Sequence, residues 1–216
     1  GIEAEQAMFK ATGGVNTHKG ALFSIGLAAV ALGGMACSNN AQLHSLSNSI
    51  ASLASLFPDT SGTHGSKAKA NNKLKGALDN AREGYEKLFA EWLPFYNERR
   101  KSHDAHALHK TLLRIMCDLD DTNVIYRTNV ATAEEVKQEA RALLASFEEA
   151  YAAEDKEKCE SAIEEKCASA IEEKCASAEL LALKDMDRRY TERNISPGGA
   201  ADMLSLTVFI GSIQTY

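Results

Sequence analysis

The chain has 216 residues, a formal net charge of −6, 44% hydrophobic residues and only three prolines. This length allows one large domain or two small ones. The acidic balance argues against a general nucleic-acid binder, which would carry a basic face.

The chain begins with Gly1 rather than Met, and the composition of its first residues is typical of the middle of a helix. We therefore expect a chain cut at its N-terminus. A charged leader and a small-residue cleavage site are both missing from the sequence. Five cysteines in such a chain indicate reduced thiols and a cytoplasmic protein.

A loop rich in chemical groups follows a predicted helix over residues 1–12. Its notable members are Gly13, Gly14, Asn16, Thr17, His18 and Lys19. The glycines can expose backbone N–H groups, and the lysine adds positive charge. A flexible polar loop before a helix is a natural anion site, although a plain capped helix start fits the same residues. The pattern is neither a Walker A motif nor GxGxxG.

Residues 21–37 are uncharged and predict a buried core helix, since the run is short for a membrane span and rich in glycine and alanine. We expect no membrane association. Apolar residues at steps of three and four predict a second, amphipathic helix over residues 43–57, ending before Pro58.

The middle of the chain carries a basic run and a histidine cluster. Lys67, Lys69, Lys73 and Lys75 favour a solvated helix start over a binding patch. Apolar spacing predicts a helix from Leu78 to Leu93, with Pro94 as its stop. The histidines are interpreted as surface residues, because helical zinc sites need further partners at set positions; they are His103, His106 and His109.

A core-facing helix over residues 108–119 runs into an acidic segment. Asp120, Asn123 and Arg127 share one face if this helix continues, and Asp121 lies beside them. Clustered carboxylates near an apolar helix need a positive partner. Mg²⁺ bound together with substrate phosphates is favoured over an internal salt bridge to Arg127, because the acids outnumber that one cation.

The next segment predicts a long helix. Thr132 to Glu135 has the form of a capping box. An eight-residue repeat then places Cys159, Cys167 and Cys175 along the helix. A step of eight residues turns a helix by about 80°, so the cysteines spiral around it rather than form a metal site. We interpret residues 153–180 as an inserted helical repeat without assigned chemistry.

A second candidate phosphate cradle lies near the C-terminus. Ser196 and Pro197 predict a helix start, as N-cap and first helical residue. Gly198 and Gly199 expose N–H groups there, and Asp202 follows as a candidate metal ligand.

Three motifs in this order resemble the triphosphoribosyl-dephospho-CoA synthase family. They are Gly-Gly-Val-Asn-Thr-His-Lys-Gly at 13–20, Leu-Asp-Asp-Thr-Asn-Val-Ile-Tyr-Arg at 119–127 and Ser-Pro-Gly-Gly-Ala-Ala-Asp at 196–202. Residues 76–85 resemble a weaker version of the family's middle segment. The family's N-terminal section, with its Pro-Lys-Pro-Gly-Leu-Val-Asp and His-Lys-Asp-Met type motifs, is not seen here.

The resemblance implies transfer of the 5-triphosphoribosyl group of ATP onto the 2′-hydroxyl of 3′-dephospho-CoA, with release of adenine. The product is the prosthetic-group precursor of citrate lyase or malonate decarboxylase acyl carrier protein, so a downstream transfer pathway is implied. Such a reaction needs a base, stabilisation of positive charge on the ribose, and neutralised phosphates.

The hypothesis assigns roles to the motif residues. The catalytic candidates are Asp121, Asp120 and His18. The Mg²⁺ candidates are Asp120, Asp121 and Asp202. The substrate- or phosphate-binding candidates are Gly13, Gly14, Asn16, Thr17, Lys19, Asn123, Arg127, Ser196, Gly198 and Gly199. Which aspartate is the base stays open.

We expect one all-α domain over residues 1–216, with mixed-length helices around the buried apolar helix and the three motifs meeting on one side. Small-molecule nucleotides are the expected partners, and a homo-oligomer is compatible with the sequence. Two alternatives stay open: an inactive fragment that binds a nucleotide or a partner, and another Mg²⁺-dependent hydrolase of nucleotides or ADP-ribose.

Overall fold

The computed structural model describes residues 1–37, 43–58, 75–160 and 165–213, and every regular element in them is helical. In chain order the elements are α1 (Ile2–Ala11), α2 (Lys19–Cys37), α3 (Leu43–Ser55), α5 (Ala77–Arg82), the π-helical η1 (Leu88–Trp92), α6 (Leu93–Lys101), α7 (Ala107–Asp118), α8 (Thr122–Arg127), α9 (Val130–Glu160), α10 (Glu165–Glu192) and α11 (Gly198–Ile213). The prediction of an all-α domain is confirmed.

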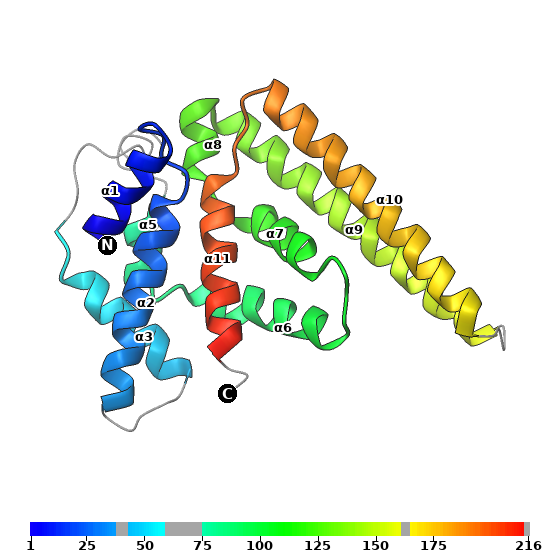
Figure 1. Cartoon of the computed structure of the whole chain (residues 1–216), viewed down its shortest axis with the longest axis horizontal. Coiled ribbons are helices and arrows are strands. Elements are labelled where there is room, and N and C mark those ends of the chain that lie inside the picture. Colours follow the sequence, from blue (N-terminus) through cyan, green and yellow to red (C-terminus); the bar gives the residue numbers. More distant parts are fainter. Residues whose placement is uncertain (38–42, 59–74, 161–164, 214–216) are drawn as a thin grey trace.

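Helix α11 runs through the middle of the molecule and packs on α2, α6, α7 and α8 (Figure 1). It is apolar on several sides and buries Ala200, Met203, Leu206 and Ile210. Burial on that scale is the main stabilising term for such a helix. The last predicted motif, at the start of α11, is therefore anchored in the centre of the fold.

Helix α2 is a core helix on one side only. Ala28 and Ala31 are buried where α2 packs on α3 and α11, whereas Val30 on the outer side is 62% exposed. Among the described residues, α2 is also the one helix long and apolar enough to cross a membrane. A core helix of a soluble protein meets the same criterion. The packing of α2 on α3 and α11 agrees with the predicted core role.

The prediction of one helix from Leu78 to Leu93 is correct at its start, since α5 begins at Ala77, but wrong in its continuity and in its stop at Pro94. Helix α5 ends after Arg82, and the left-handed residues Gly84 (φ 66°) and Tyr85 (φ 53°) turn the chain. The next helix passes through Pro94 without stopping. In the π-helical turn the N–H of Leu93 donates to the carbonyl of Leu88, so the ladder is already shifted where proline lacks its N–H.

Helices α9 and α10 form a long antiparallel pair that projects beyond the rest of the molecule (Figure 1). The predicted single helix is thus divided, with Cys159 in α9 and Cys167 and Cys175 in α10. The side chains of this repeat lie outside the described residues, as do Lys67, Lys69 and Lys73. The predicted capping box is wrong as well, because the side-chain oxygen of Asn129, not Thr132, accepts from the backbone of α9.

Candidate active site

Asp121 joins two helices. Helix α7 ends at Asp118 and the next residue is extended (ψ 132°), so the helix does not continue into the acidic segment as the shared-face prediction required. Asp121 is instead the N-cap of α8, where its Oδ1 accepts from the N–H of Asn123 at 2.9 Å and of Val124 at 3.3 Å. Its Oδ2 accepts from the N–H of Ala200 in α11 at 2.9 Å.

The Asp121 carboxylate is only 6% exposed. Burial raises its pKa, while the backbone N–H groups of Ala200, Asn123, Val124 and Gly199 act in the opposite direction by stabilising the charge. Because its oxygens accept three backbone hydrogen bonds, this carboxylate holds the start of α8 against the start of α11.

Asp202 makes the corresponding link between α11 and α2. Its Oδ1 accepts from the N–H of Ala21 at 2.9 Å. Its Oδ2 lies against Gly20 so closely that a Cβ at that position would be 2.0 Å away. Gly20 is therefore required for this approach rather than for backbone freedom. The second and third motifs meet at Asp121, and the first and third meet at Asp202.

The environment of Asp202 raises its pKa to about 6. The largest cause is burial, and the nearby charge of Asp121 adds to it. The N–H of Ala21 and the charge of His18 act in the opposite direction. A carboxylate with such a pKa can accept a proton at neutral pH more readily than an exposed aspartate.

The glycine-rich loop leads into α2 next to this pair. Gly13 (φ 64°) and Gly14 (φ 89°) adopt the left-handed backbone that favours glycine. The Asn16 side chain caps α2 by accepting from the N–H of Lys19 at 3.0 Å. The Lys19 ammonium pairs with Glu5 of α1. The side chains of Thr17 and His18, also in this loop, face each other, with Thr17 Oγ1 2.7 Å from His18 Nδ1.

The other predicted site residues lie around the α8–α11 junction. The Asn123 amide fills the space where a Cβ on Gly198 would stand, 2.5 Å from it. Arg127 is exposed and donates to the Asn194 side chain at 3.4 Å. Asp120 is exposed and pairs with Lys137 of α9 rather than with the other two aspartates. Helix α11 begins at Gly198, one residue later than the sequence predicts.

The three predicted metal ligands do not form one cluster. No group of three or more histidine, cysteine, aspartate or glutamate side chains in the described part of the chain could hold a metal. Asp120 and Asp121 are engaged as described above. Asp202, which lies between the starts of α2 and α11, accepts a hydrogen bond through Oδ1 alone, so its Oδ2 accepts none from the described residues. The site therefore fits a Mg²⁺ held mainly by substrate phosphates, with a single carboxylate beside it.

Tyr85 is a member of this site that the sequence did not indicate. Its hydroxyl is buried and has no hydrogen-bond partner among the described residues. Burial raises its pKa, and the negative charge of Asp202 adds to that effect. The apolar spacing around residue 85 predicted a core position, and only the left-handed turn after Gly84 brings the hydroxyl here.

Together these contacts bring the N-termini of α2, α8 and α11 to one place, with two uncompensated carboxylates between them. Helix N-termini attract anions, whereas the carboxylates suit a proton acceptor or a developing positive charge. The arrangement is thus equipped for a phosphorylated substrate that reacts at a carbon bearing positive charge.

Comparison with known proteins covers the whole chain. The family model for ATP:dephospho-CoA triphosphoribosyl transferase matches residues 1–216. A probable 2-(5″-triphosphoribosyl)-3′-dephosphocoenzyme-A synthase of Streptococcus mutans is 29% identical over 239 residues, covering 99% of this chain and 71% of that protein. The synthase of Klebsiella pneumoniae is 30% identical, covering 98% and 66%.

A third relative, the Haemophilus influenzae protein CitXG, is 31% identical over 232 residues, which cover 99% of this chain but 44% of that protein. The chain thus spans between less than half and about seven tenths of the length of these relatives. No solved structure matches it.

Proposed function

Because this chain belongs to the ATP:dephospho-CoA triphosphoribosyl transferase family, a family of ATP-dependent transferases, we propose that it moves the 5-triphosphoribosyl group of ATP onto the ribose 2′-hydroxyl of 3′-dephospho-CoA. The new bond joins the acceptor oxygen to the anomeric carbon of the ATP ribose. The bond from that carbon to adenine breaks, and adenine leaves with the bonding electron pair and takes up a proton.

The observation that carries the proposal is the placement of Asp202. Its carboxylate lies between the starts of α2 and α11, has one oxygen outside the backbone hydrogen bond, and has a pKa of about 6. We assign Asp202 the role of the base that accepts the proton of the attacking hydroxyl. The sequence left the base open among Asp120, Asp121 and Asp202. Backbone N–H groups occupy both oxygens of Asp121, so Asp121 is better suited as a fixed charge than as the base.

The negative charge of Asp121 still matters for the reaction. A ribose that loses adenine develops positive charge, and a fixed carboxylate near it lowers the barrier. Asp121 keeps its place through three backbone contacts, so its charge does not need to reorganise during the reaction.

Phosphate binding is assigned to the helix starts around these carboxylates. The backbone of Gly13 and Gly14, the N-terminal glycines of α11 and the side chains of Lys19 and Arg127 supply donors and positive charge. His18, Asn16 and Thr17 would contact ribose or triphosphate from the same loop. Mg²⁺ would enter with the triphosphate and be held mainly by phosphate oxygens, because Asp120 is paired with Lys137 and the available oxygen of Asp202 is assigned to the hydroxyl proton.

The product would be the prosthetic-group precursor of citrate lyase or malonate decarboxylase acyl carrier protein, made in the cytoplasm. The name CitXG of one relative favours the citrate lyase system. The homo-oligomer and the treatment of residues 153–180 as an insertion stay predictions.

The test is adenine release, followed by chromatography with ATP, Mg²⁺ and dephospho-CoA, on the longest natural reading frame that contains this chain. We expect release only when dephospho-CoA is present. Release without it would identify a hydrolase, and ATP binding without any release would identify an inactive binding protein.

Asp202→Asn keeps the shape of the side chain and should lower kcat/KM by about 10²–10⁴, the range typical of a lost general base. Asp120→Asn is the matched control, since Asp120 pairs with Lys137 at the surface and should change turnover little. Equal loss in both variants would contradict the assignment of the base.

A further inference from the structure

A groove with a volume of about 640 Å³ lies between α7 and α10, next to the candidate active site. The α10–α11 connection closes one of its sides. Most of its lining is apolar and comes from the two helices, namely from Leu112, Leu113, Met116, Leu180, Leu183 and Met186. None of the contacts described above explains why an apolar groove should remain between these helices.

The near end of the groove is continuous with the site. Arg127 of the second motif and Ser196 and Pro197 of the third motif all line it. Arg127 bridges to Asn194, which also lines the groove. A ligand held by the helix N-termini could therefore extend into the groove without crossing the core.

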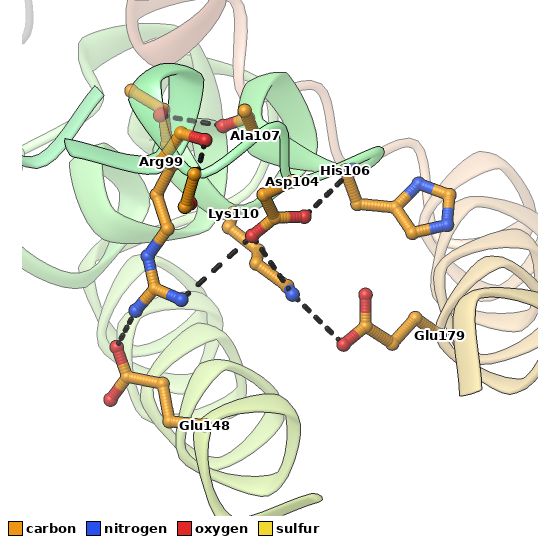
Figure 2. A network of polar contacts seen from close by, with 9 residues as sticks. Arg99, Asp104, His106, Ala107, Lys110, Glu148 and Glu179 are labelled. Carbon is orange, nitrogen blue, oxygen red and sulfur yellow. Dashed lines mark hydrogen bonds and ion pairs between the residues drawn. The ribbon is translucent and has the colours of Figure 1, made fainter. Parts of the chain in front are cut away.

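A set of buried charges, shown in Figure 2, lies next in the chain to two of the residues that line the groove. Lys110, the neighbour of the groove residue His109, pairs at 3.0 Å with Glu179, the neighbour of Leu180. Lys110 also pairs with Asp104 at 3.1 Å. From Leu180 to Thr191 the α10 side of the groove is about 16 Å long at 1.5 Å per residue.

The charges along the groove are mainly positive. Arg127 and Lys184 line it, against a single carboxylate, Asp187. A long apolar channel with Arg127 at its mouth suits a ligand that has an anionic group at one end and an uncharged chain beyond it.

We propose that this groove holds the pantetheine arm of dephospho-CoA, with the diphosphate of that substrate at Arg127. The arm is a long, uncharged chain with a branched apolar part and two amides, and it begins at a diphosphate. Its amides would find polar partners in Thr191 and Asn194, which line the groove near its mouth. This inference rests on the proposed function, because it names where one substrate of that reaction lies.

The test is the dissociation constant of dephospho-CoA and of ADP, measured by calorimetry on the same protein. ADP carries the nucleoside diphosphate without the arm. Leu180→Trp should obstruct the groove, weaken dephospho-CoA binding at least about tenfold and leave ADP binding unchanged. Leu181→Trp is the matched control, since Leu181 is the next residue, is 67% exposed and does not line the groove.

A second obstruction guards against a folding defect. Thr191→Trp changes an exposed residue near the mouth and should have the same selective effect. Equal losses for both ligands, unchanged dephospho-CoA binding in both variants, or no dephospho-CoA binding by the unmodified protein would overturn the proposal.

The two proposals can fail separately. Arm-dependent binding without adenine release would refute the reaction and leave the groove assignment standing. Adenine release with an unchanged KM for dephospho-CoA in Leu180→Trp would leave the reaction standing and refute the groove assignment.

Discussion

The molecule buries acidic side chains in two different ways. At the site, Asp121 and Asp202 accept hydrogen bonds from backbone N–H groups at helix N-termini, and neither forms an ion pair with a lysine or arginine of the described residues. Beside α10, Asp104 and Glu179 are paired with the buried ammonium of Lys110, and Arg99 links Asp104 to Glu148 of α9 (Figure 2).

The difference separates a reactive site from a structural one. Backbone dipoles hold a carboxylate in place but leave its net charge, so burial raises the pKa of Asp202 and the group can still take a proton or face a cation. A buried ammonium between two carboxylates compensates the charge and ties α7 and the connection before it to α10. We call the set Arg99, Asp104, Lys110, Glu148 and Glu179 the ion-pair cluster.

The largest expected effect comes from breaking the ion-pair cluster. Lys110→Met leaves Glu179 without its ammonium partner and Asp104 with Arg99 alone. Breaking a buried pair in this way typically costs about 3–5 kcal/mol, so the free energy of unfolding should fall by a similar amount. Arg188→Met is the control, because Arg188 forms only exposed pairs with Asp185 and Glu192 on α10. Its effect should be much smaller, because water screens exposed ion pairs. Denaturant titration of both variants measures this, and equal effects would contradict the comparison.

The site should respond more mildly in stability but strongly in activity. Gly20→Ala places a Cβ 2.0 Å from Asp202 Oδ2 and should cost about 1–3 kcal/mol as overpacking, while displacing the catalytic carboxylate. Gly26→Ala in the same helix meets open space and should stabilise the protein by about 0.5–1 kcal/mol. Unfolding and adenine release are measured on both. Full activity in Gly20→Ala would count against the role of Asp202.

A comparable stability effect is expected at Asp121. Asp121→Asn keeps an acceptor for Asn123 and Val124 but sets an amide N–H₂ against the buried N–H of Ala200, so the loss should be about 1–3 kcal/mol. Turnover should fall with KM for ATP little changed, because the charge acts on the transition state. A variant that loses ATP binding instead would indicate a ground-state role.

The pH dependence should show opposite trends for activity and stability. With Asp202 as the proposed base, only its ionised form is active, so kcat/KM should rise with pH and level off above about 6. The folded protein holds the Asp202 proton up to a higher pH than the unfolded chain does. Stability from this group should therefore fall as pH rises from about 4 to about 6.

The control for this prediction is Asp202→Asn, which cannot titrate. Its unfolding free energy should decline less between pH 4 and pH 6 than that of the unmodified protein. Parallel stability curves for the two proteins would show that burial does not raise the pKa of Asp202.

Much of the fold could be predicted because it rests on short-range energetics. The apolar periodicity of residues 43–57 predicted α3, and the core run at 108–119 predicted α7, each within two residues at either end. Prediction failed where local signals competed. Pro94 was predicted to end a helix, because the shifted hydrogen bonds of a π-helical turn have no clear sequence signature. Thr132 was predicted to be the N-cap, although Asn129, three residues earlier, is the residue that caps α9.

The sequence by itself determined the helical class, the motifs and the residue types that could serve as base or phosphate ligand. The tertiary structure decided which carboxylate has which partner. Asp121 meets the N–H of a residue 79 positions away and Asp202 one 181 positions away, whereas Asp120, next to Asp121 in the chain, turns to Lys137. Such partners depend on how α2, α8 and α11 pack, and burial created by that packing sets the pKa that distinguishes a base from a cap.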